Sequence, residues 1–164
     1  MKKNLIALIV FGVAFGFVEA AVVYYLRTLF GFRSNFVPHG NYKLILNLGL
    51  IVFLKPGSVV LPNVQIARAE ALRELATLIM QGAVSFLAGN LPKTRLAAFL
   101  ISFATWDVFY YVFLRLLTGW PKTLMDIDVF FLDPIPWVGP VITAIIISTL
   151  LFGAGVMIYC REQN

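Results

Sequence analysis

Four acidic residues and one arginine lie in segments that are otherwise apolar. They are Glu19, Glu70, Arg73, Glu74 and Asp107. Asp107 is the most central of them, near the middle of the apolar run 96–117. An acid at the middle of a membrane-spanning helix costs roughly 2.5–3.5 kcal/mol, so it normally faces the protein interior and has a partner. These five residues therefore form the candidate ligand- or ion-binding site.

Three kinds of chemistry fit these residue types. In a structural cluster, Arg73 neutralises one or two acids, the others are protonated, and the polar contacts specify helix packing. In a metal site, Glu19, Glu74 and Asp107 bind an ion, as glutamates from several helices do in carboxylate-bridged centres. Since Glu-x-x-His pairs are absent from the sequence, a hard divalent cation such as Mg²⁺, Ca²⁺ or Mn²⁺ suits this version. In a third version, the acids line a pathway for protons or small cations, or a pocket for a polar substrate.

Polar residues near the acids have helical spacing. Glu70, Glu74, Thr77, Gln81 and Ser85 recur at steps of three or four residues. This spacing puts them on one face of a helix, and a polar face on an apolar span is expected to point into a helix bundle. Thr77, Gln81 and Ser85, together with Tyr110, are the candidate lining of a polar pathway or pocket. None of these residues specifies a reaction, so whether the protein is an enzyme is left open.

The composition is that of an integral membrane protein. Of 164 residues, 60% are hydrophobic and 13% are charged, whereas a soluble domain carries about 25% charged residues. The net charge of +5 comes mostly from Lys and Arg at the ends of apolar segments, which favours lipid headgroups over nucleic acid as the partner. Cys160 and His39 are the only residues of their types, which excludes an intrachain disulfide and a zinc site built on several histidines.

The apolar segments predict an all-α bundle that forms a single domain. Spans are expected at about residues 4–26, 69–89, 96–117 and 140–159. A further apolar segment, 42–54, reaches only about 20 Å as a helix, short of the roughly 30 Å hydrocarbon core. We interpret it as a short interfacial or re-entrant helix, with a fifth span kinked at Pro56 as the alternative. The acids of the 122–140 connection, Asp126, Asp128 and Asp133, are expected to be solvated.

The basic residues also predict an orientation. In a bundle of four spans, one end carries the short basic segments, with Lys2, Lys3, Lys93, Arg95 and Arg161. Basic short loops usually lie in the cytoplasm. We therefore expect both termini to be cytoplasmic, the 122–140 connection to be outside, and the acidic site to lie in the outer half of the membrane.

Two motifs resemble a known group of proteins. The runs WDVFYYVFLRLLTGWP (106–121) and DIDVFFLDPIPWVGPV (126–141) look like those of a family of small polytopic prokaryotic membrane proteins. An early Glu19 before Tyr25-Leu26-Arg27 fits the same pattern, as does Glu70 followed by Arg73, Glu74 and Thr77. Residues 33–67 depart from it. The resemblance implies a prokaryotic cytoplasmic membrane, but that family has no assigned function and so supplies no activity.

Two classes of function follow from the sequence. The first is a small multi-pass membrane protein whose outward-facing acidic intramembrane site binds a cation or a small polar ligand. The second is a non-catalytic accessory subunit of a larger membrane complex, with other membrane proteins as partners. A ligand site requires its acids to converge, whereas a subunit requires an open face of small residues, such as Gly12/Gly16/Ala20 or Ala144/Ser148/Gly155.

Overall fold

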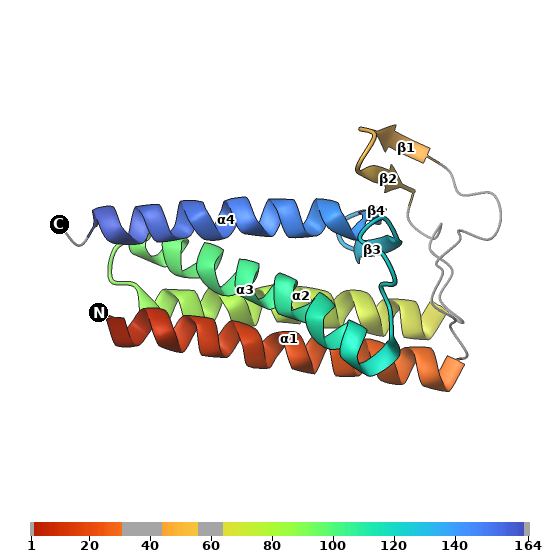
Figure 1. Ribbon diagram of the computed structural model, residues 1–164, viewed down its shortest axis with the longest axis horizontal. Helices are drawn as coiled ribbons and strands as arrows, with labels where there is room; N and C mark the ends of the chain where they lie inside the picture. The colour runs from red at the N-terminus through yellow and green to blue at the C-terminus, as the bar shows by residue number, and fades with distance from the viewer. Residues whose placement is uncertain (1, 31–43, 56–63, 163–164) are drawn as a thin grey trace.

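Four long helices dominate the computed structural model, which describes residues 2–30, 44–55 and 64–162. They are α1 (Lys2–Phe30), α2 (Val64–Ala88), α3 (Pro92–Thr118) and α4 (Val141–Arg161). Within the described residues, each of the four is long and apolar enough to cross a membrane. Figure 1 shows them running side by side, with both chain termini at one end of the bundle. Four helices that could span a membrane are thus confirmed, and each begins or ends within a few residues of the expected bounds.

Helix α3 occupies the centre of the bundle. It packs against α1, α2 and α4, and it has the largest buried share of the four helices. Pro92 is the first residue of α3, where its missing N–H costs nothing because that position has no acceptor within the helix. The Thr94 side chain accepts a hydrogen bond from the Leu91 N–H at 3.0 Å. Gly119 ends it in the left-handed conformation, with its N–H donated to the Arg115 carbonyl.

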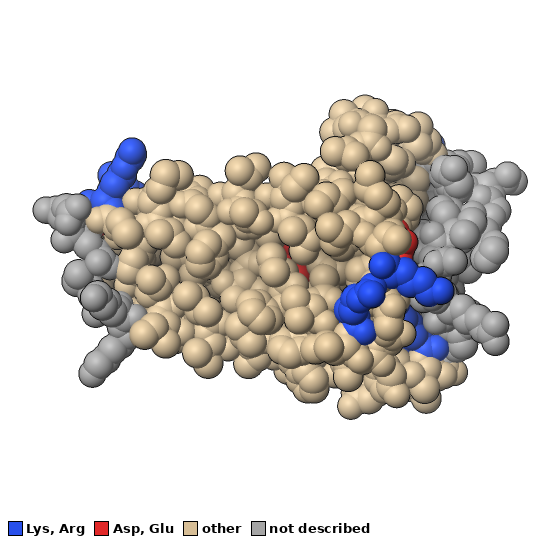
Figure 2. All heavy atoms as spheres, viewed as in Figure 1, with Lys and Arg blue, Asp and Glu red and all other residues tan. Residues whose placement is uncertain are grey.

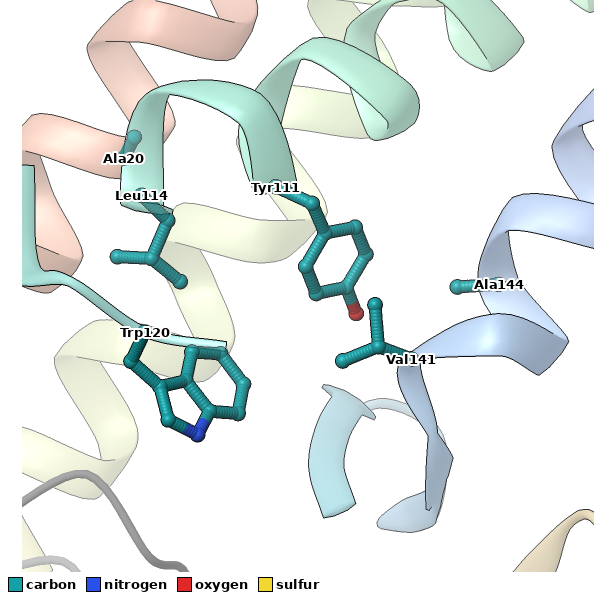
Figure 3. Close-up of a cluster of buried hydrophobic side chains, with 6 residues drawn as sticks. All are labelled: Ala20, Tyr111, Leu114, Trp120, Val141 and Ala144. Atoms are coloured by element: carbon teal, nitrogen blue, oxygen red, sulfur yellow. The ribbon is translucent and has the colours of Figure 1, made fainter. Parts of the chain in front are cut away.

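Small residues let α1 and α4 approach α3 closely. A Cβ on Gly16 would lie 2.9 Å from the Trp106 carbonyl oxygen, and one on Gly155 would lie 3.1 Å from the Ala97 carbonyl oxygen. Glycine thus permits backbone-to-backbone contact on both sides of α3. Two hydrophobic clusters fill the remaining space. One is Leu8, Ala97, Ala98, Ile101 and Tyr159, and the other, shown in Figure 3, is Ala20, Tyr111, Leu114, Trp120, Val141 and Ala144.

A small antiparallel sheet lies at the end of the bundle opposite the termini (Figure 1). Its strands are β1 (Leu44–Asn47), β2 (Val52–Leu54), β3 (Ile127–Phe131) and β4 (Trp137–Pro140), in the spatial order β1-β2-β4-β3. We call this end of the bundle the sheet end and the other the terminal end. The prediction of an all-α fold is therefore wrong at the sheet end.

The predicted short helix over residues 42–54 is a β-hairpin in its described part. Gly49 adopts a positive φ of 84°, and its N–H donates to the Asn47 side chain at 2.8 Å, which reverses the chain between β1 and β2. Val52 and Phe53 of β2 then pair with Val138 and Trp137 of β4. The segment is too short to span a membrane as a helix, and strand pairing satisfies its backbone instead. Residues 42 and 43 and Pro56 lie outside the described residues.

The surface of the bundle is that of a membrane protein. Large apolar side chains such as Leu29, Leu72, Leu87 and Leu150 are exposed along the helices. Figure 2 shows the long middle of one face free of Lys and Arg, which gather at both ends. At the terminal end, Lys93 at the start of α3 forms an ion pair with Glu162 just after α4 at 3.1 Å.

Candidate intramembrane acidic site

Arg73 of α2 joins two of the predicted acids. Its Nη1 donates to Glu19 Oε2 of α1 at 2.5 Å, and its Nε donates to Glu70 Oε2 at 3.0 Å. Its Nη2 also donates to Glu70 Oε1, so the guanidinium binds Glu70 in a bidentate manner through two parallel hydrogen bonds. The side chains of Glu19 and Glu70 are each 13% exposed. Arg73 thus pairs with two of the four acids, as expected for the structural version of the cluster.

Glu74 lies one helical turn beyond Glu70 but has a different partner. The Leu132 N–H, just after β3, donates to Glu74 Oε2 at 2.7 Å. Glu74 also interacts electrostatically with Arg73, Glu70 and Glu19. This carboxylate therefore fixes the β3 end of the loop against α2, next to the Arg73 ion pairs.

Asp107 faces α4 rather than Arg73. The Ser148 hydroxyl donates to Asp107 Oδ2 at 2.7 Å, and Ser148 itself is 1% exposed. Among the described residues, Asp107 forms no ion pair. Glu19, Glu74 and Asp107 thus have three different partners: Arg73, the Leu132 N–H and the Ser148 hydroxyl.

The metal version of the site gains no support from this geometry. Within residues 2–30, 44–55 and 64–162, no three His, Cys, Asp or Glu side chains lie close enough together to hold a metal ion. His39 lies outside these ranges. A metal held jointly by Glu19, Glu74 and Asp107 is therefore not carried forward.

A second buried pair at the sheet end escaped sequence reasoning. Asp128 of β3 is only 7% exposed, and the Tyr111 hydroxyl donates to its Oδ2 at 3.1 Å. Burial raises the pKa of the Asp128 carboxyl from 3.8 to about 6, although the nearby Arg27 guanidinium and the Tyr111 hydroxyl oppose this shift. The expectation that Asp128 is solvated is wrong. In the sequence, the position of Asp128 between Ile127 and Val129 in an apolar run was the one indication of this burial.

Asp126, two residues earlier, behaves as a loop acid. Its carboxylate accepts the N–H groups of Lys122 and Thr123 and the Thr123 hydroxyl. The Thr123 hydroxyl bond is the main reason that the pKa of Asp126 lies below its ordinary value. The two neighbouring acids of one strand-and-loop segment thus have opposite environments.

Tyr110 connects these separate contacts. Its half-buried side chain is influenced by the charges of Glu19, Arg27, Asp107 and Asp128, which come from α1, α3 and β3. The acids therefore do not share one set of ligands, but three of them act electrostatically on Tyr110. This placement agrees with the expected role of Tyr110 as a lining residue, although the role itself is untested.

The polar stripe of α2 faces inward. Thr77, Gln81 and Ser85 are at most 3% exposed, which confirms that they face the interior of the bundle. The Thr77 hydroxyl donates to the Arg73 carbonyl and the Ser85 hydroxyl to the Gln81 carbonyl, each within α2. The Gln81 side chain is fully buried, yet neither amide atom has a hydrogen-bond partner among the described residues.

The chain matches no family model, no curated protein and no solved structure.

Proposed function

We propose that this protein is a multi-pass membrane protein that binds a small cation or a small polar ligand at the acidic site in the sheet-end half of its bundle. Asp107 carries the proposal. It is a carboxyl inside a membrane-spanning helix, its one described hydrogen-bond partner is the Ser148 hydroxyl, and it has no cationic partner among the described residues. A carboxylate in such surroundings requires either a proton or a bound cation.

The charge balance of the neighbouring residues supports the same conclusion. Arg73 is the only cation within ion-pair distance of Glu19 and Glu70 in the part of the chain that the structure describes. Glu74 adds a further acid beside them, held by a backbone N–H. The acids outnumber the cations, so a positively charged or proton-donating ligand would complete the site. Figure 2 shows acidic atoms set back in the middle of one face, between residues other than Lys, Arg, Asp and Glu.

Neither of the conditions set by the sequence is met in full: Glu19, Glu74 and Asp107 do not converge on one partner, and the accessory-subunit alternative also lacks its open face. It required a face of small residues that is left open for a partner. Gly12 and Gly16 are packed against the backbone of α3, and Ala20 is fully buried. Ser148 and Gly155 of α4 are also buried against α3. Both faces therefore hold this bundle together.

Thermal unfolding of the detergent-purified protein tests the proposal. The melting temperature of the unaltered chain should rise with the concentration of the cation that fits the site, among Na⁺, K⁺, Mg²⁺, Ca²⁺ and Mn²⁺. Mass action predicts a stabilisation of about 2.7 kcal/mol at a ligand concentration one hundred times Kd. Asp107→Asn keeps the shape of the side chain and should abolish this rise.

Asp126→Asn is the matched control, because it removes one acid at the same end of the molecule but from a loop. It should leave the cation response intact. Identical melting curves with and without every cation would eliminate the cation version. An equal loss in both variants would show that the response reflects overall charge and not Asp107.

A further inference from the structure

Two cationic side chains contact Trp120 and Pro121 at the sheet end, and a third cationic residue follows Pro121 in the chain. The guanidinium carbon of Arg27, from α1, lies 4.3 Å from the centre of the Trp120 ring. Arg115, from the last turn of α3, donates to the Pro121 carbonyl oxygen, and the exposed Lys122 comes next in the chain. Figure 2 shows Lys and Arg side chains gathered on the surface at this end. The three cations therefore come from two helices and a loop.

The packing of α1 on α3 brings the two arginines to the same end of the bundle. Gly12 packs on Ser102 and Thr105, and Gly16 packs on Trp106 and Tyr110, so the two helices run parallel, and each has its arginine in its last turn. Arginine near a helix C-terminus compensates the partial negative charge of the last carbonyls. Arg115 fulfils this ordinary role through the Pro121 carbonyl. The same role does not account for the surroundings of Arg27.

The Nη1 atom of Arg27 is buried and has no hydrogen-bond partner among the described residues. No acid forms an ion pair with Arg27, although every acid of the chain is described. Asp128 influences it only electrostatically, from beyond ion-pair distance. A buried guanidinium N–H without an acceptor is destabilising, because it has lost its water and gained no hydrogen bond. Within residues 2–30, 44–55 and 64–162, the surroundings of Arg27 thus offer its Nη1 no oxygen acceptor.

We propose that Arg27, supported by Arg115 and Lys122, binds the phosphate of a phosphodiester group at the membrane interface. The planar guanidinium can donate two parallel hydrogen bonds to phosphate oxygens. Its face stacks on the Trp120 ring, and its N–H donors lie along its edge. Trp120 follows the end of a membrane-spanning helix, where tryptophan usually marks the headgroup level. Asp126 and Asp128 offset part of the positive charge, which favours a singly charged phosphodiester over a doubly charged phosphate. This site is independent of the acidic site around Asp107.

The test measures the melting temperature of the full chain in detergent as short-chain phosphatidylglycerol, phosphatidylcholine, inorganic phosphate or sulfate is added. Phosphatidylglycerol should raise the melting temperature of the unaltered chain. Arg27→Gln should weaken the apparent affinity roughly tenfold or more, because it removes charge-assisted hydrogen bonds. If that variant does not fold, Arg27→Lys keeps the charge but lacks the paired N–H donors of a guanidinium, so it should bind with intermediate affinity.

Arg95→Gln is the matched control, since Arg95 is also stacked, 3.7 Å above the Phe86 ring, and also bonds a carbonyl, that of Gly89 at 3.0 Å. It removes the same charge at the terminal end and should leave the lipid response unchanged. A response to inorganic phosphate stronger than that to the lipid overturns the assignment to a phosphodiester at the membrane interface. The proposal is overturned if Arg27→Gln responds like the unaltered chain, or if Arg95→Gln loses as much.

Discussion

Protonation of Asp128 should stabilise the folded protein, and the structure sets the size of the effect. The pKa of this carboxyl is raised from 3.8 to about 6 by burial in β3 beneath Tyr111. Between about pH 4 and pH 6, the folded protein holds a proton that the unfolded chain has released. The free energy of unfolding therefore falls as pH rises through this window. About 2 pKa units correspond to roughly 3 kcal/mol, and the slope vanishes outside the window.

The measurement is equilibrium unfolding in mixed micelles between pH 4 and pH 8, compared with the variant Asp128→Asn. Asparagine cannot titrate but still accepts the Tyr111 hydroxyl bond, so the difference between the two proteins isolates the carboxyl. Subtracting the variant from the unaltered chain should leave a stability that declines with rising pH. Asp126→Asn supplies a control of opposite sign, because the pKa of Asp126 is lowered and its contribution is lost as pH falls. A flat or rising difference for Asp128 would refute the inference that it is desolvated.

Other predictions concern packing, burial and orientation. Gly16→Ala should destabilise the protein by about 1–3 kcal/mol in the same unfolding assay, because the added Cβ would lie 2.9 Å from the backbone of α3. Gly82→Ala should be neutral or stabilising, because a Cβ at Gly82 has nothing within 4 Å. Gln81→Leu should raise the free energy of unfolding by about 1–3 kcal/mol, since it removes two buried polar atoms without partners, and a destabilised variant would contradict this. With Cys160 replaced by serine, a cysteine at Lys122 should label only from outside the cell, and labelling only from the cytoplasm would reverse the predicted orientation.

The helices were accessible from the sequence because length and hydropathy are local properties. The sheet was not, because β2 pairs with β4, more than 80 residues later in the chain, and no local periodicity reports such a pairing. Asn47 and Gly49 did offer a turn signal inside an apolar segment. The segment length dominated the interpretation and favoured a short helix.

The same difference between local and long-range contacts applies to the candidate site. Arg73 was expected to neutralise one or two of the acids, and it forms ion pairs with Glu19 and Glu70. Asp107 was placed inside the bundle correctly, but its partner Ser148 lies on another helix, where it was interpreted as part of a packing face. Asp128 was assigned to solvent from the polarity of its loop. Partners from different elements are set by the fold, and one sequence without that fold does not identify them.

The hairpin formed by β1 and β2 imposes an order on the assembly of the protein in the cell. Its side chains Leu44, Leu46 and Leu48 are about half exposed even in the finished molecule. The hairpin leaves the ribosome between α1 and α2, yet β4 is synthesised only after α3. At about 5–20 residues per second, the hairpin waits roughly 4–16 s for its partner strand. During that interval an apolar strand edge is unpaired, so the membrane surface or the insertion machinery must shield it until the last helix enters.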